Sequence, residues 1–135
     1  MKRLFLALVM FFFLAGSASA EILTFEWNQV DTTNLKEWKL FWGDTSGGPY
    51  TELSTIPYDG SPGPVYSSPA EANVTGDQGT NVVKYFVLIA CGDVPQASGT
   101  PEYLCSEDSN EVSHSFWIPA GMFSVPIEFK IISSQ

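Results

Sequence analysis

Few residues in this chain have the chemistry for acid–base, nucleophilic or metal-dependent catalysis. The 135-residue sequence has one histidine, His114, and two cysteines, Cys91 and Cys105, beside fifteen Asp and Glu residues. A zinc site needs three or four nitrogen or sulfur ligands, and a Ser-His-Asp triad needs its histidine beside a nucleophile. His114 stands between two serines in a stretch with strand character, which favours an ordinary strand-surface residue. We therefore expect no catalytic residue, no metal site and no cofactor.

The carboxylates leave two alternatives open. Glu107, Asp108 and Glu111, with Asp93 nearby, could offer oxygens to a calcium ion, although no D-x-D-x-D-G loop is present. A pair of carboxylates could cleave a glycosidic bond, but the sequence marks out no such pair. A small accessory carbohydrate-binding or hydrolase-associated module is therefore an alternative and not the main interpretation.

The two cysteines are predicted to form a disulfide. Cys91 and Cys105 are fourteen positions apart, which is not the C-x-x-C spacing of a redox pair. In the chain-entropy model, a disulfide that closes a loop of about 15 residues contributes roughly 3 kcal/mol. The segment between the cysteines contains turn residues at several points, so we expect the disulfide to be structural.

The first twenty residues have the order of a secretory signal peptide. A basic start at residues 1–3 precedes eleven apolar residues at 4–14, and small residues lead up to Ala20. Eleven residues span only about 16 Å as a helix, while the hydrocarbon core of a bilayer needs roughly 20 residues. We expect cleavage after Ala20, an extracytoplasmic location (secreted, periplasmic or cell-surface) and no stable membrane span once the leader is removed.

The chain that remains after cleavage would be strongly acidic. It retains four lysines against fifteen Asp and Glu residues, which gives a net charge of −11. Four scattered lysines cannot neutralise a row of phosphates, so we expect no nucleic-acid partner. An anionic membrane surface would also repel this chain.

Alternation of apolar and polar residues predicts an all-β fold. No segment after the leader has helical spacing over three turns, and turn residues separate the alternating segments. These features favour an antiparallel β-sandwich of about seven strands, with a closed barrel as the alternative. Strands are expected at residues 22–27, 38–42, 50–56, 71–75, 82–90, 111–118 and 127–131, and an irregular connection with at most an edge strand is expected at 57–69.

The strand parities also predict which side chains form the core. The inward set is Phe25, Trp27, Trp38, Leu40, Trp42, Phe86 and Leu88. Trp117 is expected in the core as well, because tryptophan on the strands of a small sandwich is usually interior. Exposed contacts are expected from Phe41, Tyr50, Tyr58, Tyr66 and Tyr103.

Several segments resemble a fibronectin type III domain. Residues 23–27 (LTFEW) resemble its B strand, and residues 38–43 (WKLFWG) resemble its C strand. Residues 84–90 (KYFVLIA) resemble its F strand, although Lys84 stands where that family usually has a tyrosine. Residues 109–113 (SNEVS) resemble the opening of its G strand. The resemblance covers roughly residues 22–116 and implies an immunoglobulin-like sandwich that acts as a non-enzymatic binding or adhesion module.

The resemblance also suggests where binding takes place. Loops at one end of such sandwiches often carry binding, because a rigid scaffold presents them. The connection between the F-like and G-like strands is longer than usual and contains both cysteines. Asp93, Gln96 and Tyr103 in this connection are therefore the candidate binding residues, and the expected partner is a protein or a glycan.

The resemblance lacks a first strand, since the B-like strand follows the predicted cleavage site directly. Residues 123–131 (FSVPIEFKI) alternate and resemble a proline-containing opening strand. We expect this segment to complete the sandwich within its own chain. The alternatives are pairing beyond the last strand and insertion into a second copy, which would make the protein a structural subunit of a surface assembly. The expected organisation is a leader at 1–20, a sandwich at 21–118 and a C-terminal strand segment at 119–135.

Overall fold

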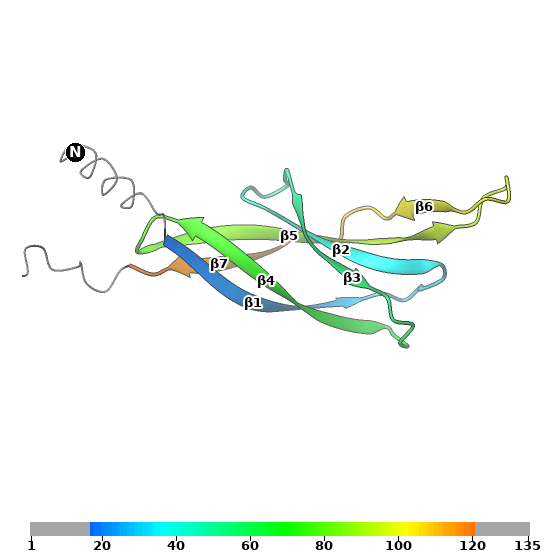
Figure 1. The fold of residues 1–135 in the computed structure, drawn as a ribbon, viewed down its shortest axis with the longest axis horizontal. Coiled ribbons are helices and arrows are strands. Elements are labelled where there is room, and N and C mark those ends of the chain that lie inside the picture. The colour runs from blue at the N-terminus through cyan, green and yellow to red at the C-terminus, as the bar shows by residue number, and fades with distance from the viewer. Residues whose placement is uncertain (1–16, 121–135) are drawn as a thin grey trace, which may run out of the picture.

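Two antiparallel β-sheets face each other in the structure, a computed structural model that describes residues 17–120 (Figure 1). The all-β class and the antiparallel sandwich expected from the alternation are confirmed, and the two separate sheets rule out the closed-barrel alternative. No helix occurs among the described residues. The strands are β1 (Ser17–Asn28), β2 (Leu35–Gly43), β3 (Thr51–Pro57), β4 (Val65–Gly76), β5 (Thr80–Val94), β6 (Glu102–Cys105) and β7 (Val112–Ile118).

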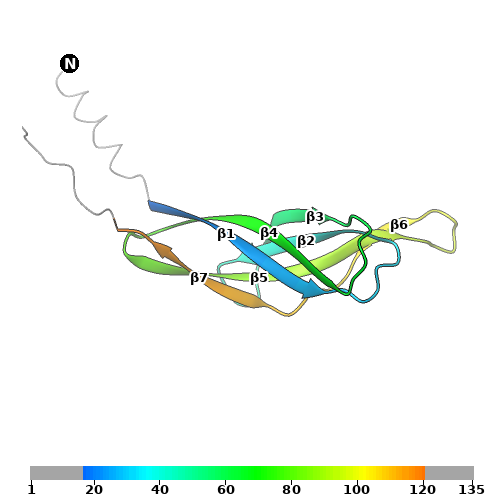
Figure 2. The same ribbon diagram turned by 90° about the horizontal axis from the view of Figure 1, so that it is seen from below.

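The long strand β5 organises the larger sheet. β2 pairs with one edge of β5, and β3 extends the sheet beyond β2. Two short strands share the other edge of β5: β7 pairs with its first half and β6 with its last four residues. The smaller sheet contains β1 and β4. β1 begins and β7 ends at one end of the sandwich, and the β5–β6 hairpin projects from the opposite end (Figures 1 and 2).

Phe86 lies at the centre of the core between the sheets. Its side chain is 1% exposed, and its ring centroid lies 5.1 Å from that of Phe25 and 6.1 Å from that of Trp42. This contact shows that Phe86, and not Tyr85, faces the other sheet. Of the expected core residues, Trp38, Leu40 and Phe86 are buried, and Phe25, Trp27, Trp42 and Leu88 are partly buried. The buried core cluster contains Leu40, Ala70, Ala72, Val74, Phe86, Phe116 and Ile118.

Four aromatic side chains form a second cluster where β1 ends and β2 begins. The Trp38 ring centroid lies 5.1 Å from that of Trp27, 5.5 Å from that of Tyr58 and 4.8 Å from that of Tyr66. Both tyrosine hydroxyls donate to the backbone carbonyl of Ser61, at 3.2 and 3.0 Å. The expectation that Tyr58 and Tyr66 are exposed contacts is therefore wrong. Both rings are partly buried against tryptophan, with each hydroxyl oriented to a backbone acceptor.

Trp117 is the second correction among the aromatic residues. Its side chain is 53% exposed, whereas the neighbouring Phe116 and Ile118 are fully buried. Successive residues of a strand point to opposite faces, so two inward neighbours force Trp117 outward. The same period-two argument, applied to this strand in the sequence, would have given the correct side.

Strand β4 starts earlier than the sequence suggested. Residues 57–69 were expected to be irregular with at most an edge strand, and β4, which pairs only with β1, begins at Val65 and runs without a break to Gly76. Pro69 is tolerated because it lies opposite Thr24 on a strand that has only one hydrogen-bonded neighbour. The Gln29 amide donates to the Pro64 carbonyl at 2.8 Å, just beyond the end of the ladder. Hydrogen-bonded and non-bonded residue pairs alternate along an antiparallel ladder. Counting from the bonded Gln29–Pro64 pair, the Thr24–Pro69 pair is a non-bonded one, so the missing N–H of Pro69 costs no ladder bond.

Strand β1 includes residues that the sequence assigns to the leader. Residues 17–20 pair with residues 73–76 of β4. Cleavage after Ala20 stays a prediction, and it would remove this part of the ladder. Residues 1–16 and the strand expected at 127–131 lie outside the described residues. Within the described part of the chain, no helix has the length and apolarity to cross a bilayer.

Candidate functional site

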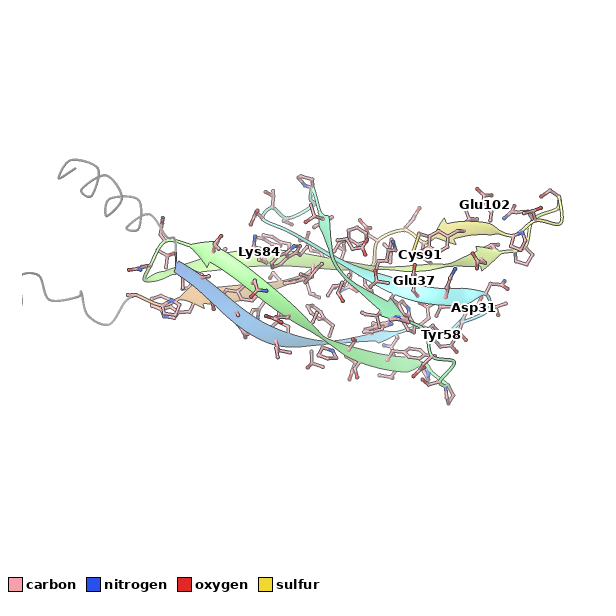
Figure 3. The ribbon with its side chains drawn as sticks, viewed as in Figure 1. Asp31, Glu37, Tyr58, Lys84, Cys91 and Glu102 are labelled. Atoms are coloured by element: carbon pink, nitrogen blue, oxygen red, sulfur yellow. A yellow bond between two sulfur atoms is a disulfide. The ribbon has the colours of Figure 1, made fainter. Side chains whose placement is uncertain are left out.

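The segment between the cysteines is a β-hairpin and not an irregular loop. Cys91 on β5 lies directly opposite Cys105 on β6, and the two are joined by a disulfide with an S–S distance of 2.09 Å. β6 has no alternation that would have predicted it. Figure 3 shows Glu102 on the projecting hairpin and Cys91 closer to the sandwich, near Glu37 of the neighbouring strand β2. The disulfide thus fixes the hairpin where it leaves the larger sheet.

Two of the three candidate binding residues attach the hairpin to β2. Asp93 and Tyr103 are opposite each other in the β5–β6 ladder. The Lys36 ammonium lies 3.5 Å from the Asp93 carboxylate and 5.7 Å from the centroid of the Tyr103 ring. The Tyr103 hydroxyl donates to the Glu37 carboxylate. The exposed Lys36–Asp93 pair contributes little by itself, so the Tyr103 contact is the more specific link.

The hydrogen bond to Glu37 gives Tyr103 an unusual titration. Together with partial burial and the negative charge of Glu37, it raises the pKa of Tyr103 to about 12. A raised folded-state pKa means that the contribution of Tyr103 to stability is complete below the ordinary tyrosine pKa of about 10. That contribution is lost as the pH rises through about 12.

We expect this titration to be visible by ultraviolet absorbance of tyrosinate. The native protein should show a tyrosine that ionises near pH 12, and the Tyr103→Phe variant should lose this step while Tyr50 and Tyr66, whose pKa values are also raised, keep theirs. The Glu37→Gln variant should move this step toward the ordinary pKa of tyrosine, because the charged acceptor is removed. A Tyr103→Phe protein with an unchanged high-pH step would contradict the contact.

Gln96 is placed in the hairpin turn. Its side-chain amide donates to the backbone carbonyl of Val94 at 3.2 Å, and its backbone carbonyl accepts from the backbone amide of Gly99 at 2.9 Å. Gly99 has a φ of 86°, a conformation that favours glycine. Gln96 therefore stabilises the turn, and the exposed residues around it form the tip of the hairpin.

The base of the hairpin carries a surface that the sequence did not indicate. Gly92 lets the β1–β2 loop approach the hairpin: a Cβ atom at this position would lie 1.9 Å from the Asn34 carbonyl oxygen. The loop and the hairpin enclose an open hollow of about 260 Å³. Leu104 lines this hollow and is 42% exposed, and Val30, 89% exposed, belongs to the β1–β2 loop between the lining residues Gln29 and Asp31. The only feature of the sequence that could have indicated this surface is Val30, an apolar residue within the otherwise polar segment 29–34.

A larger hollow of about 460 Å³ lies between the sheets, beside the edge of β1. One side is lined by core aromatic residues, including Phe25, Trp27 and Phe86, and the other by the connection between β6 and β7. The indole nitrogen of Trp27 is buried and has no hydrogen-bond partner within residues 17–120. The hollow therefore has an aromatic wall that contains a buried unpaired donor and a polar wall from the β6–β7 connection, and it is not part of the closed core.

The connection between β6 and β7 follows β5 without forming a strand. The Ser106 amide donates to the Ala90 carbonyl at 2.8 Å, and the Ala90 amide donates back to the Ser106 hydroxyl at 3.0 Å. Ser109 makes the equivalent two bonds with Leu88, each 2.9 Å long. Two serine hydroxyls thus take the place of backbone carbonyls as acceptors for the amides of Leu88 and Ala90 in the centre of β5.

The acidic residues do not form an ion site in the described part of the chain. Glu111 accepts from the Ser46 hydroxyl at 2.6 Å, from the Gly47 amide at 2.8 Å and from the Tyr50 hydroxyl. These hydrogen bonds lower the pKa of Glu111 and hold the β2–β3 turn against the start of β7. Asp93 is engaged by Lys36, and within residues 17–120 no three potential metal ligands come together.

His114 connects the two sheets at the edge of the sandwich. Its Nε2 atom lies 3.1 Å from the Glu21 carboxylate of β1, and its ring packs edge-on against Phe116. The partner of the ring nitrogen is thus a carboxylate on the other sheet and not the hydroxyl of Ser113 or Ser115. The arrangement positions β1 against β7.

Comparison with known proteins gives no match: no family model fits the chain, and neither the curated proteins nor the solved structures include one with significant similarity.

Proposed function

We propose that the chain is an exported, non-enzymatic binding module of the fibronectin type III kind. Its contact surface is the β5–β6 hairpin together with the β1–β2 loop at the base of the hairpin. The arrangement of the strands supports the fold part of the proposal. The segments that resemble strands C, F and G lie in β2, β5 and β7 of one sheet, and the segment that resembles strand B lies in β1 of the other. Sandwiches of the immunoglobulin type have this division.

The observation that carries the functional part is a hairpin that projects and is also held rigid. The disulfide, the hydrogen bond from Tyr103 to Glu37 and the close approach at Gly92 fix it to the sandwich. A preformed projecting element loses little conformational entropy when it binds. Leu104 at its base and Val30 on the β1–β2 loop offer exposed apolar contact area without any need to unfold.

A protein partner fits this surface better than a glycan. Sugar binding commonly requires an exposed aromatic ring on which to stack, but Trp27 and Trp38 pack against each other inside the sandwich. The Tyr103 ring on the hairpin is exposed, but the Lys36 ammonium lies 5.7 Å from its centroid and its hydroxyl is engaged by Glu37. Trp117 is exposed, yet it lies on β7 at the other end of the molecule from the hairpin. The hairpin base offers aliphatic side chains beside Asp31, Asp93 and Glu102, which suits a protein surface with apolar and basic residues.

The disulfide supports the extracytoplasmic part of the proposal. Disulfides persist mainly in oxidising compartments, and Cys91 and Cys105 leave no free cysteine in the described residues. An N-terminal sequence of protein recovered from the native host would begin at Glu21 if the predicted leader is removed. The absence of cleavage would contradict the export route.

The contact surface is tested by two matched substitutions. Leu104→Asp changes the proposed surface, and Val83→Asp introduces the same charge on the first half of β5 at a similar exposure, 41% against 42%. The leader-free native protein serves as bait in extracytoplasmic extract of the host, and bound proteins are identified by mass spectrometry. We expect partners that bind the native and Val83→Asp proteins and fail to bind the Leu104→Asp protein. Equal binding by both folded variants would overturn the assignment of the surface.

A further inference from the structure

One edge of β1 has no strand beside it among the described residues. β1 pairs with β4 along its whole length, from Ser17 opposite Gly76 to Asn28 opposite Val65. The hydrogen bond from the Gln29 amide to the Pro64 carbonyl shows which residues of β1 form backbone hydrogen bonds with β4, because hydrogen-bonded and non-bonded pairs alternate along an antiparallel ladder. The odd-numbered residues of β1 bond to β4. The amides of Ile22, Thr24 and Glu26 therefore point to the unpaired edge.

The larger hollow lies beside this edge. Phe25 and Trp27 line it from β1, and Phe86 and Leu88 line it from β5. Leu23, Phe25 and Trp27 are only partly buried, although their parity faces the core. An unpaired edge beside a half-covered apolar surface is a favourable place for an additional strand.

We propose that residues 123–131 of the same chain form this additional strand, parallel to β1, with their apolar face over the hollow. This inference is independent of the hairpin surface. In the sequence FSVPIEFKI, five apolar residues share one parity, and Ser124, Pro126, Glu128 and Lys130 share the other. The apolar parity covers Leu23, Phe25 and Trp27, and the polar parity stays in solvent beside Thr24 and Glu26.

The end of β7 sets the direction of the added strand. Ile118 ends β7 next to Gly76, since a Cβ atom on Gly76 would lie 3.3 Å from the Ile118 side chain. Gly76 is also the partner of Ser17, the first residue of β1. A chain that leaves Ile118 and turns back therefore runs beside β1 from its first residues toward Asn28. Nine extended residues cover roughly 30 Å at about 3.3 Å each, enough to reach the hollow.

Pro126 discriminates between the two possible directions. On a β-strand, the backbone N–H and C=O of a residue point to one of the two neighbouring strands. Which one is decided by the direction of the strand and by the face of the sheet on which the side chain lies. With the apolar parity inward, a parallel strand beside β1 directs the nitrogen of Pro126 away from β1, where no donor is needed. An antiparallel strand would place this nitrogen in the ladder, where the missing N–H costs a hydrogen bond. The sequence thus suits the parallel direction that the end of β7 provides.

Insertion into the same chain is favoured over insertion into a second copy. Residues 119–122 (PAGM) contain Pro119 and Gly121, which suit a turn. A short tether gives the segment an effective concentration in the millimolar range, well above ordinary protein concentrations. Covering the edge of β1 within the chain also removes a surface on which strands of other molecules could add.

Amide hydrogen exchange by NMR tests this proposal on the full leader-free chain and on a chain that ends at Ala120. We expect the amides of Ile22, Thr24 and Glu26 to exchange at least about fivefold more slowly in the full chain, as for an added ladder bond of about 1 kcal/mol. The amides of Leu23 and Phe25, which bond to β4, serve as internal controls. Equal rates at the three edge amides in both chains would overturn the proposal.

Two substitutions keep the proposal testable if the shortened chain does not fold. Ile127→Asp places a charge on the apolar parity, and Lys130→Asp places one on the polar parity of the same segment. We expect only Ile127→Asp to speed exchange at the edge amides of β1 and to lower the melting temperature. Similar effects of the two changes would contradict the orientation. Sedimentation that shows a concentration-dependent dimer of the full chain, absent in the shortened chain, would favour insertion into a second copy and overturn insertion within the chain.

Discussion

Replacing Phe86 by alanine should destabilise the protein by about 3–5 kcal/mol, the range for loss of a fully buried phenylalanine. Phe86 is 1% exposed, and it contacts Phe25 of the facing sheet and Trp42 of its own sheet. The cost includes the lost contacts with both aromatic rings and the cavity that the shorter alanine side chain would leave between the sheets. Stabilities of small domains are themselves only about 5–15 kcal/mol, so this change would leave the fold marginal.

Urea unfolding followed by tryptophan fluorescence measures this effect. Val83→Ala is the matched control on the same strand: its side chain is 41% exposed, and we expect a loss of about 1 kcal/mol or less. A Phe86→Ala protein as stable as the control would show that Phe86 does not join the two sheets. That result would also place Tyr85 on the inward face of β5.

Removing both cysteines should have the second-largest effect, a loss of roughly 3 kcal/mol for a loop of this length. The double variant Cys91→Ala with Cys105→Ala avoids leaving a hydroxyl in the buried position of Cys91, which is 2% exposed. Only four residue pairs join β5 to β6, and a short two-stranded hairpin is marginal in water by itself. The amides of β6 should therefore lose protection from exchange before those of β5.

A reducing agent provides the control for the cysteine variant. It should lower the stability of the native protein to that of the double variant and leave the double variant unchanged. If reduction does not change the unfolding midpoint of the native protein, the disulfide does not hold the hairpin, and the hairpin would not be the rigid contact surface that we propose.

Strand positions could be predicted where side chains alternate against one buried face. β1 and β2 were found because Phe25 and Leu40 have neighbours that fit period two. β5 was found instead because residues 82–90 are almost all β-favouring and are apolar on both parities. β6 could not be found in this way, because all four of its residues are exposed. It exists because the disulfide and the contact from Tyr103 hold it against β5, and neither pairing is visible in local sequence.

The candidate surface was predicted in part. The sequence pointed to the segment between the cysteines, but it did not indicate that Asp93 and Tyr103 contact β2. The apolar contacts at Val30 and Leu104 depend on the approach of the β1–β2 loop at Gly92, which is a long-range packing effect. Serine hydroxyls that replace backbone carbonyls beside β5 have no sequence signature at all.

The dissociation constants of the Leu104→Asp and Val83→Asp proteins, measured with one partner from the host, test the account most directly. Truncation of a central interface residue can weaken binding by more than 1 kcal/mol, so we expect the constant for Leu104→Asp to be at least about fivefold the native value. The constant for Val83→Asp should equal the native one. A ratio near one between the two variants, with both proteins folded, would contradict binding through the hairpin.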